Sequence, residues 1–326
     1  MAHFLEKYRS ARRRHVHSLI TRASRPGVAG WNSRAARRSR HFPDNIWPEL
    51  GISFPLAHDR MKIFLTGASS GIGLATARAL LAHGHEVWGT SRDSQRVPQL
   101  ERLHPVQLDL ADSASVEKAF SAALAEAGHF DVLINNASSG HFGPVENLSD
   151  QEIENQFRIV VFAHLQLIRL ALRAMRERGH GLVINVTSLA SRLPVPFMGA
   201  YNAGKAAMAA FTMSIQLELP DARVRIVDLQ PGDICTAFND AVIKSSQPDS
   251  QYETKLSKTW TTVERNMAAA PKPDLVARHI LRLIEQANPP ARVTVGDVFQ
   301  SKIAPLIFRF LPQRLRIWGL KKYYGI

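Results

Sequence analysis

The chain has 326 residues, of which 45% are apolar, and a formal net charge of +13. This length suits one large α/β domain or two small ones, and the apolar fraction is ordinary for a chain that buries a core. The single cysteine excludes an intrachain disulfide and favours a reducing, cytoplasmic compartment. No apolar run reaches the roughly 20 residues of a membrane-spanning helix, and the N-terminus lacks the apolar stretch of a secretory signal.

The positive charge is concentrated at the two ends of the chain. Residues 1–60 hold 12 Lys and Arg against 4 Asp and Glu, and residues 298–326 hold 6 Lys and Arg with no acidic residue. The segment between them has a net charge of −1. A basic groove across the central domain is therefore not expected, which argues against nucleic acid as a partner.

Residues 1–60 differ in composition from the rest of the chain. Eleven of their 12 basic residues are Arg, and prolines and glycines interrupt any apolar periodicity. Three interpretations stay open: an organellar transit peptide, a disordered basic arm, or a segment outside the native protein, with synthesis starting at Met61. We favour the third, because Met61 directly precedes the first predicted strand.

From Met61 onward, short apolar runs alternate with helical patterns. Strands are predicted at 62–66, 86–91, 105–108, 132–134, 182–187, 224–229 and 292–295. Helices are predicted at 72–83, 113–127, 150–177, 199–219 and 274–286. The helix at 150–177 opens with a capping-box pattern, Ser149-x-x-Glu152. Strands separated by helices at this spacing predict a single α/β domain with a doubly wound parallel sheet, residues 61–297.

The polar stretch 233–272 is too long for an ordinary connection between a strand and a helix. In a doubly wound sheet it would lie beyond the carboxyl ends of the strands, where ligands bind. We expect it to form a substrate lid with one or two short helices.

A glycine-rich sequence, Thr-Gly-Ala-Ser-Ser-Gly-Ile-Gly at 66–73, separates the first predicted strand from the first helix. In this context it predicts a dinucleotide site. Gly67 permits a tight turn, Gly71 lets the backbone approach a pyrophosphate, and Gly73 allows close packing of helix and strand. The helix N-terminus offers unpaired N–H groups to the phosphates. The predicted cofactor residues of this loop are Gly67, Ser69, Ser70, Gly71, Ile72 and Gly73.

The end of the second strand sets the choice between the two nicotinamide cofactors. An acidic residue there accepts the ribose hydroxyls, whereas a cation pairs with the extra phosphate of NADP. Here Arg92 follows Ser91, and a guanidinium binds phosphate with charge-assisted, bidentate geometry, so we predict NADP. Asp93 would cap a helix or bind a ribose. Further residues at strand ends are expected to line the adenosine half: Asp109, Asn135 and Ala137.

The helix at 199–219 begins with Tyr201-Asn-Ala-Gly-Lys205, and Ser188 lies 13 residues before the tyrosine at a strand end. Residues four apart share a helix face, so Tyr201 and Lys205 point to one site. The ammonium and a positive nicotinamide ring would favour the phenolate, so we expect a lowered pKa for Tyr201. Tyr201 would then exchange the alcohol proton, Ser188 would bind the substrate oxygen, and Lys205 would also hold the nicotinamide ribose.

Together these motifs resemble the short-chain dehydrogenase/reductase superfamily over nearly all of residues 61–297. The residues that carry the resemblance are the glycine loop, Asn135-Asn136-Ala137, Ser188, Tyr201 with Lys205, and Pro231-Gly232-x-x-x-Thr236. The resemblance implies a Rossmann-like fold and a homodimer or homotetramer formed through the helices at 150–177 and 199–219. It also implies that the loop after the sixth predicted strand binds the cofactor through Pro231, Gly232, Ile234 and Thr236. Of these, Ile234 and Thr236 would contact the nicotinamide.

Within the superfamily, Arg92 and the Phe310-Leu311-Pro312 segment resemble the branch of 17β-hydroxysteroid and retinol dehydrogenases and their bacterial relatives. This resemblance implies an NADP-dependent oxidoreductase that interconverts a secondary alcohol and a ketone or aldehyde. It further implies that the small-molecule substrate is lipophilic. No metal is expected, since His83 and His85 have no acid or cysteine partner nearby.

Two positions depart from the family pattern. Val160 lies where the family commonly has an Asn that holds a water for proton relay to the Lys, and Ser138 replaces a glycine after Asn-Asn-Ala. Valine cannot hydrogen-bond, so the relay is either absent or rerouted. The alternative function is therefore a catalytically impaired, cofactor-binding regulatory or scaffold protein of the same fold. The intact Ser188, Tyr201 and Lys205 argue for the enzyme.

The C-terminal extension, residues 298–326, carries an amphipathic pattern. Its apolar residues recur at the spacing i, i+3, i+4, i+7 and i+8, which predicts a helix with one apolar face. These residues are Ile303, Leu306, Ile307, Phe310 and Leu311. Pro312 would end this helix, and the six cations of the extension would favour contact with anionic lipid and a membrane-associated location. The alternative is a helix docked on the substrate site or on a dimer partner, with Lys and Arg reaching water.

Overall fold

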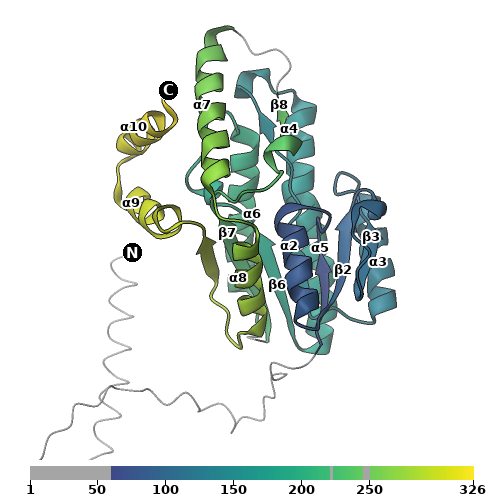
Figure 1. Ribbon diagram of the computed structural model, residues 1–326. Coiled ribbons are helices and arrows are strands. Elements are labelled where there is room, and N and C mark those ends of the chain that lie inside the picture. Colours follow the sequence, from purple (N-terminus) through teal and green to yellow (C-terminus); the bar gives the residue numbers. More distant parts are fainter. Residues whose placement is uncertain (1–59, 221–222, 245–249) are drawn as a thin grey trace, which may run out of the picture. The chain divides into compact units, whose positions relative to one another are not determined.

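The computed structural model describes residues 60–220, 223–244 and 250–326 (Figure 1). The three interpretations of the basic N-terminal segment concern residues 1–59, which lie outside the described residues.

A seven-stranded parallel sheet forms the centre of the domain. Its strands are β1 (Lys62–Leu65), β2 (Glu86–Ser91), β3 (Leu103–Gln107), β4 (Val132–Asn135), β6 (Gly181–Val186), β7 (Val224–Pro231) and β9 (Arg292–Val295). Their order is β3-β2-β1-β4-β6-β7-β9, and all neighbouring strands run parallel. The strand order reverses between β1 and β4, the point where such sheets bind ligands. The predicted Rossmann-like fold is confirmed.

Helices cover both faces of the sheet (Figure 1). They are α2 (Gly71–Ala82) and α8 (Asp274–Glu285) on one face, and α3 (Ser113–Ala127), α5 (Ala163–Arg178) and α6 (Gly199–Glu218) on the other. The sheet residues alternate between two cores, since Ile63 and Leu65 pack with α2 and α8 while Phe64 packs with α3 and α5. Because both faces are covered, the central strands β1, β4 and β6 are mostly apolar and buried. Short 3₁₀ turns complete the loops: η2 (Ser94–Arg96), η3 (Val145–Asn147) and η5 (Leu189–Ser191).

The helix predicted at 150–177 consists of two helices joined by a π turn. α4 (Asp150–Phe157) leads into η4 (Arg158–Phe162), which continues as α5. The predicted capping box is present, with the Ser149 hydroxyl and the Glu152 carboxylate each accepting the other residue's backbone N–H. A π turn inserts a residue without requiring Gly or Pro, so the apolar pattern gave no sign of it.

The expectation of one or two short helices in the stretch 233–272 was wrong. This stretch holds the 3₁₀ turn η6 (Asn239–Ala241), the short strand β8 (Ile243–Lys244) and one 20-residue helix, α7 (Ser250–Ala269). β8 pairs with β5 (His141–Phe142) in a separate two-stranded sheet. α7 is polar on average, which hid the apolar pair Leu256 and Trp260, four residues apart on one helix face.

The C-terminal extension lies at the β9 edge of the domain, beside α7 (Figure 1). It forms the π turn η7 (Phe299–Ile303), α9 (Ala304–Phe310) and α10 (Gln313–Tyr324), with Pro312 between the two helices as predicted. Asp233 N donates to Gln300 Oε1 at 2.9 Å, and Asn266 Nδ2 donates to the Tyr323 hydroxyl at 2.8 Å. Within the described part of the chain, no helix is long and apolar enough to cross a bilayer.

Candidate active site

The glycine-rich loop between β1 and α2 is shaped for close backbone approach. Gly67 and Gly71 have φ values of +72° and +53°, which side chains rarely tolerate. A Cβ on Gly73 would lie 1.9 Å from the Gly67 carbonyl oxygen, so helix and loop touch at the backbone. Ser70 is the N-cap residue of α2, but its side chain makes no capping hydrogen bond. The loop therefore retains the backbone shape and free helix end that a pyrophosphate needs.

Two other loops meet this one at the carboxyl edge of the sheet. The Thr66 hydroxyl accepts hydrogen bonds from Asn136 N at 2.9 Å and Ala137 N at 3.0 Å, which joins the loops after β1 and β4. The Thr236 side chain lies 3.5 Å from the position of a Cβ on Gly71. The loop after β7 therefore faces the phosphate end of the predicted site.

The residues at the end of β2 differ in their exposure to solvent. Ser91 is nearly buried, and Arg92 is exposed, with no ion pair to any described residue. Asp93 uses its carboxylate to accept a hydrogen bond from Gln95 N at 3.0 Å, capping η2. Of the two roles considered for Asp93, the structure displays capping.

Two residues at strand ends, both expected near the adenosine, differ in burial and in their hydrogen-bond partners. Asp109 is exposed, and its carboxylate accepts from Ala111 N at 2.9 Å. Asn135 is buried, and its Nδ2 donates to Asn185 Oδ1 at 2.9 Å, while Asn185 Nδ2 donates to Thr212 Oγ1 at 2.8 Å. The side chain of Asn135 therefore points into the interior and links β4, β6 and α6.

Ser188, Tyr201 and Lys205 come together at the carboxyl end of β6 and the start of α6. Ser188 follows β6, its hydroxyl accepts from Ala190 N at 3.0 Å, and its side chain is close enough to Tyr201 to lower the pKa of the phenol. Lys205 is buried, and its Nζ donates to the Val186 carbonyl at 2.9 Å and lies 5.9 Å from the centroid of the Tyr201 ring. The three residues thus form one contiguous constellation.

The expectation of a lowered pKa for Tyr201 does not hold for these contacts. Burial raises the pKa of Tyr201 to about 12, and the nearby Asp233 carboxylate raises it further, while the hydrogen bond with Ser188 lowers it. The reason is desolvation: the half-buried phenol packs against an apolar cluster, and Lys205 directs one N–H to Val186 rather than to the phenol. At neutral pH the phenol therefore keeps its proton.

Lys205 has a neighbour that the sequence did not point to. Burial lowers the pKa of Lys205 to about 8, and the charge of Asp228 counteracts that shift. Asp228 is buried and accepts from Gln230 Nε2 and Arg292 Nε, each at 2.7 Å. The charge of Asp228 thus helps to keep the ammonium of Lys205 charged.

The loop after β7 carries the predicted nicotinamide contacts. Following Pro231 at the strand end, Gly232 N donates to the Val295 carbonyl at 2.7 Å. Ile234 is buried in the core with α2 and α8, and the Thr236 hydroxyl accepts from Phe238 N at 3.3 Å. The loop is therefore anchored by its backbone at one end and by an apolar side chain in the middle.

An apolar cluster beside Tyr201 was also missed from the sequence. Phe142, Met198 and Val242 are buried in it, and Tyr201, Phe238 and Trp260 pack against them. The rings of Tyr201 and Phe238 have centroids 5.6 Å apart. Its members come from separate segments, so no local pattern could have revealed the cluster. It gives the tyrosine an apolar wall.

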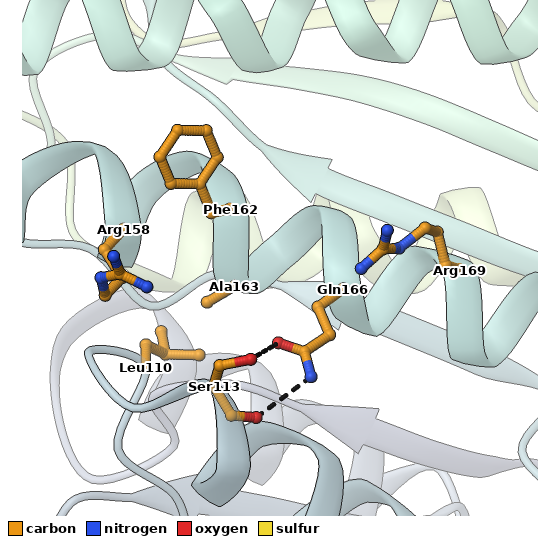
Figure 2. Close-up of a pocket in the computed structure, with 7 residues that line it drawn as sticks. All are labelled: Leu110, Ser113, Arg158, Phe162, Ala163, Gln166 and Arg169. Atoms are coloured by element: carbon orange, nitrogen blue, oxygen red, sulfur yellow. Dashed lines mark hydrogen bonds between the residues drawn. The ribbon is translucent and has the colours of Figure 1, made fainter. Parts of the chain in front are cut away.

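The chain's surface also has a pocket of about 140 Å³ away from this constellation (Figure 2). It is lined by Leu110, Ser113, Arg158, Phe162, Ala163, Gln166 and Arg169. Ser113 Oγ donates to Gln166 Oε1 and Gln166 Nε2 donates to the Ser113 carbonyl, both at 3.0 Å, which ties α3 to α5. No catalytic candidate lines this pocket, so it belongs to the outer surface of α5. Among the described residues, no group of His, Cys, Asp and Glu is arranged to hold a metal ion.

Comparisons with known proteins agree with this arrangement. The short chain dehydrogenase family matches residues 61–247. The chain belongs to this family. A 3-ketodihydrosphingosine reductase of Bacteroides thetaiotaomicron is 29% identical over 81% of this chain and 98% of its own length. A solved short-chain dehydrogenase from Streptomyces avermitilis is 26% identical, has a TM-score of 0.69, and aligns over 83% of this chain and 98% of its own. A metagenomic short-chain oxidoreductase in complex with NADP is 28% identical with a TM-score of 0.60, over 73% and 98%.

In this short-chain dehydrogenase, both departures from the family pattern can be placed. Val160 lies in the π turn, fully buried, with Cγ1 3.2 Å from the position of a Cβ on Gly204. It therefore packs against α6 at the residue before Lys205. Ser138 turns its hydroxyl toward the Ser139 carbonyl at 3.4 Å.

Proposed function

We propose that this chain is an NADP(H)-dependent oxidoreductase that interconverts a secondary alcohol and a ketone or aldehyde. The observation that carries the proposal is the contiguous placement of Ser188, Tyr201 and Lys205 beside the glycine-rich loop. A scaffold protein would have no need of a buried ammonium below a hydrogen-bonded tyrosine and serine.

In the direction of carbonyl reduction, each residue of the site has a role. NADPH, when bound, supplies the hydride. Tyr201, with a pKa raised to about 12, holds the proton that the carbonyl oxygen must receive. Ser188 is placed to hydrogen-bond the same oxygen, and Lys205 to hold the nicotinamide ribose and keep the tyrosine oriented. The product is an alcohol, whose new O–H proton comes from Tyr201.

The fit of NADP rests on the loop geometry and on Arg92. The missing Cβ of Gly73 lets the backbone form the phosphate-binding turn, and the exposed Arg92 guanidinium has no partner among the described residues. Because Asp93 is engaged in a cap, Arg92 meets the cofactor without a competing carboxylate. The related metagenomic enzyme in complex with NADP supports the same choice.

A lipophilic substrate is supported by the apolar wall beside Tyr201. Phe142 and Trp260 pack edge to face with centroids 4.8 Å apart, and Phe238 contacts Tyr201 directly. The Bacteroides relative is named for the reduction of 3-ketodihydrosphingosine, a lipid ketone. We therefore expect an apolar chain next to the reacting carbonyl, lying against these rings.

The test is NADPH oxidation by the full chain over a panel of ketones graded in chain length, with short polar ketones as controls. Turnover that improves with chain length supports the proposal. Trp260→Ala should then raise KM for the longest ketone and leave the shortest one unchanged. NADPH binding with no turnover on any carbonyl would instead establish the cofactor-binding scaffold.

A homo-oligomer formed through α5, the π turn η4 before it, and α6 is supported by exposed apolar side chains on η4 and α6. They are Phe162, at 53% exposure, and Phe211, Met213 and Leu217, at 43%, 53% and 83%. Large apolar residues at such exposure are typical of an interface. Leu217→Glu should shift the chain toward the monomer in sedimentation velocity, whereas a wild-type monomer would contradict the proposal.

Peripheral binding of the C-terminal extension to anionic lipid is supported by its exposed apolar residues and its charge. The exposed side chains are Val298, Phe299, Ile303, Leu306, Ile307, Phe310, Leu315, Ile317, Trp318 and Tyr323. The same segment carries six cations and no acid, which suits a negatively charged surface. The full chain should float with phosphatidylglycerol vesicles more than with phosphatidylcholine vesicles. The pair Phe310→Ser and Trp318→Ser should abolish flotation, and Leu100→Ser should not.

A further inference from the structure

His164, in the first turn of α5, holds a buried imidazole nitrogen without a partner. The residue is 2% exposed, and its Nδ1 lies 3.2 Å from the carbonyl oxygen of Val160, one turn earlier. Since a carbonyl only accepts, Nδ1 carries the proton and Nε2 is an acceptor in the neutral ring. No described residue hydrogen-bonds to Nε2. Buried acceptors of this kind are nearly always paired, with protein or with water.

The charged donor that acts on His164 is Lys205. Burial and then the positive charge of Lys205 lower the pKa of His164 to about 3, so the imidazole stays neutral and able to accept. The π turn before His164 packs against α6 through Val160 and Gly204, directly beside Lys205. The imidazole and the ammonium therefore face the same interior region between α5 and α6.

Lys205 has donors to spare in this region. An ammonium has three N–H groups, and the Val186 carbonyl accepts one of them at 2.9 Å. The side chain that packs on this part of α6 from the π turn is Val160, which has no polar atom. An acceptor for a further Lys205 donor therefore has to come from elsewhere, and His164 Nε2 is of the required kind. The two side chains are not directly hydrogen-bonded, so one water molecule is the shortest link.

We propose that His164 is a positioning residue of the active site, linked to Lys205 by one water that accepts from the ammonium and donates to His164 Nε2. His164 lies one helical turn after Val160, and through the water it gives Lys205 the polar contact that the Val160 side chain cannot make. It fixes the ammonium under Tyr201. It also opens a route for protons. After Tyr201 has given its proton to the carbonyl oxygen, Lys205 donates one to the phenolate, the water returns one to Lys205, and solvent returns one to the water, so each reduction takes up one proton from bulk water. The catalytic meaning of the link rests on the proposed function, whereas the link itself does not.

The first test removes the hydrogen-bond acceptor at position 164 and then restores one, either at position 164 or at position 160. His164→Leu should lower kcat for ketone reduction by at least about tenfold with little change in KM, and raise the solvent isotope effect. His164→Gln, which keeps an acceptor, and Val160→Asn in the His164→Leu background should each restore most of the loss. His279→Leu is the matched control, since His279 makes the same bond to the carbonyl four residues back, at 2.8 Å, on α8.

Thermal unfolding and NADPH affinity, measured for each variant, separate loss of fold from loss of the link. A folded His164→Leu protein within about twofold of wild type in kcat, with an unchanged isotope effect, would overturn the inference. The inference would also be overturned if folded His164→Leu and folded Val160→Asn/His164→Leu lost the same amount of kcat. The polar group restored beside Lys205 would then have no effect.

A crystal structure of the full chain that resolves ordered water tests the link without activity. The expected result is a water within hydrogen-bond distance of both Lys205 Nζ and His164 Nε2, which disappears in His164→Leu. A wild-type structure without it refutes the inference even if the enzyme is active. A wild type that shows this water but reduces no carbonyl refutes the proposed function alone.

Discussion

Replacing Arg92 by alanine tests the cofactor choice at the residue that makes it. The guanidinium is exposed at the end of β2 and has no ion pair among the described residues, so it is available to the extra phosphate of NADPH without breaking another interaction. A hydrogen bond to a charged group contributes about 1.5–3 kcal/mol. At about 1.4 kcal/mol per tenfold change, Arg92→Ala should raise the Kd for NADPH roughly 10- to 150-fold. NADH lacks this phosphate, so its Kd should hardly change.

The assay is fluorescence titration of the full chain with each cofactor at several salt concentrations. Salt should weaken NADPH binding to the wild type more than binding to Arg92→Ala, because the pairing of guanidinium and phosphate is ionic and exposed to solvent. Arg78→Ala is the matched control, since it removes an exposed cation from α2 away from the end of β2. Equal losses of affinity for NADPH and NADH, or a wild type that prefers NADH, would show that Arg92 does not select the cofactor.

Three further predictions follow from the site and the chain ends. Tyr201→Phe should lower kcat at least about 10²-fold with NADPH affinity nearly unchanged, because the ring stays and the transferable proton is removed; a variant within about twofold of wild type would refute the acid role. The kcat of reduction should fall as pH rises through about 8, since Lys205, with its pKa lowered to about 8, loses its charge there while Tyr201 stays protonated. A pH profile that rises through that region would contradict this assignment. A chain lacking residues 1–60 should keep its melting temperature and NADPH affinity, because the first strand starts at Lys62; failure to fold would show that the segment contributes to the domain.

The fold was predictable because its signals are local. Parallel strands buried on both faces read as short apolar runs, and β2, α3 and β9 begin and end at the predicted residues. The break at Arg158–Phe162 was missed because a π turn needs no special residue and leaves the apolar pattern intact. α7 was underestimated because its apolar contacts are few and its average composition is polar.

The chemistry of the site was predictable only in part. The spacing of Tyr201 and Lys205 on one helix face follows from helical geometry, and Ser188 from its place at a strand end. The expectation of a lowered pKa for Tyr201 counted the ammonium and the nicotinamide ring and left out burial, which raises the pKa of the phenol in the structure. Asp228 lies far from Lys205 in sequence, and only the pairing of β6, β7 and β9 brings its carboxylate beneath the ammonium.

Burial acts on all three titratable groups of the site in one sense. Desolvation disfavours whichever form is charged, so it raises the pKa of Tyr201, lowers that of Lys205 and keeps His164 neutral. At neutral pH the site therefore holds a phenol with its proton, an ammonium able to replace that proton, and an imidazole that accepts without adding charge.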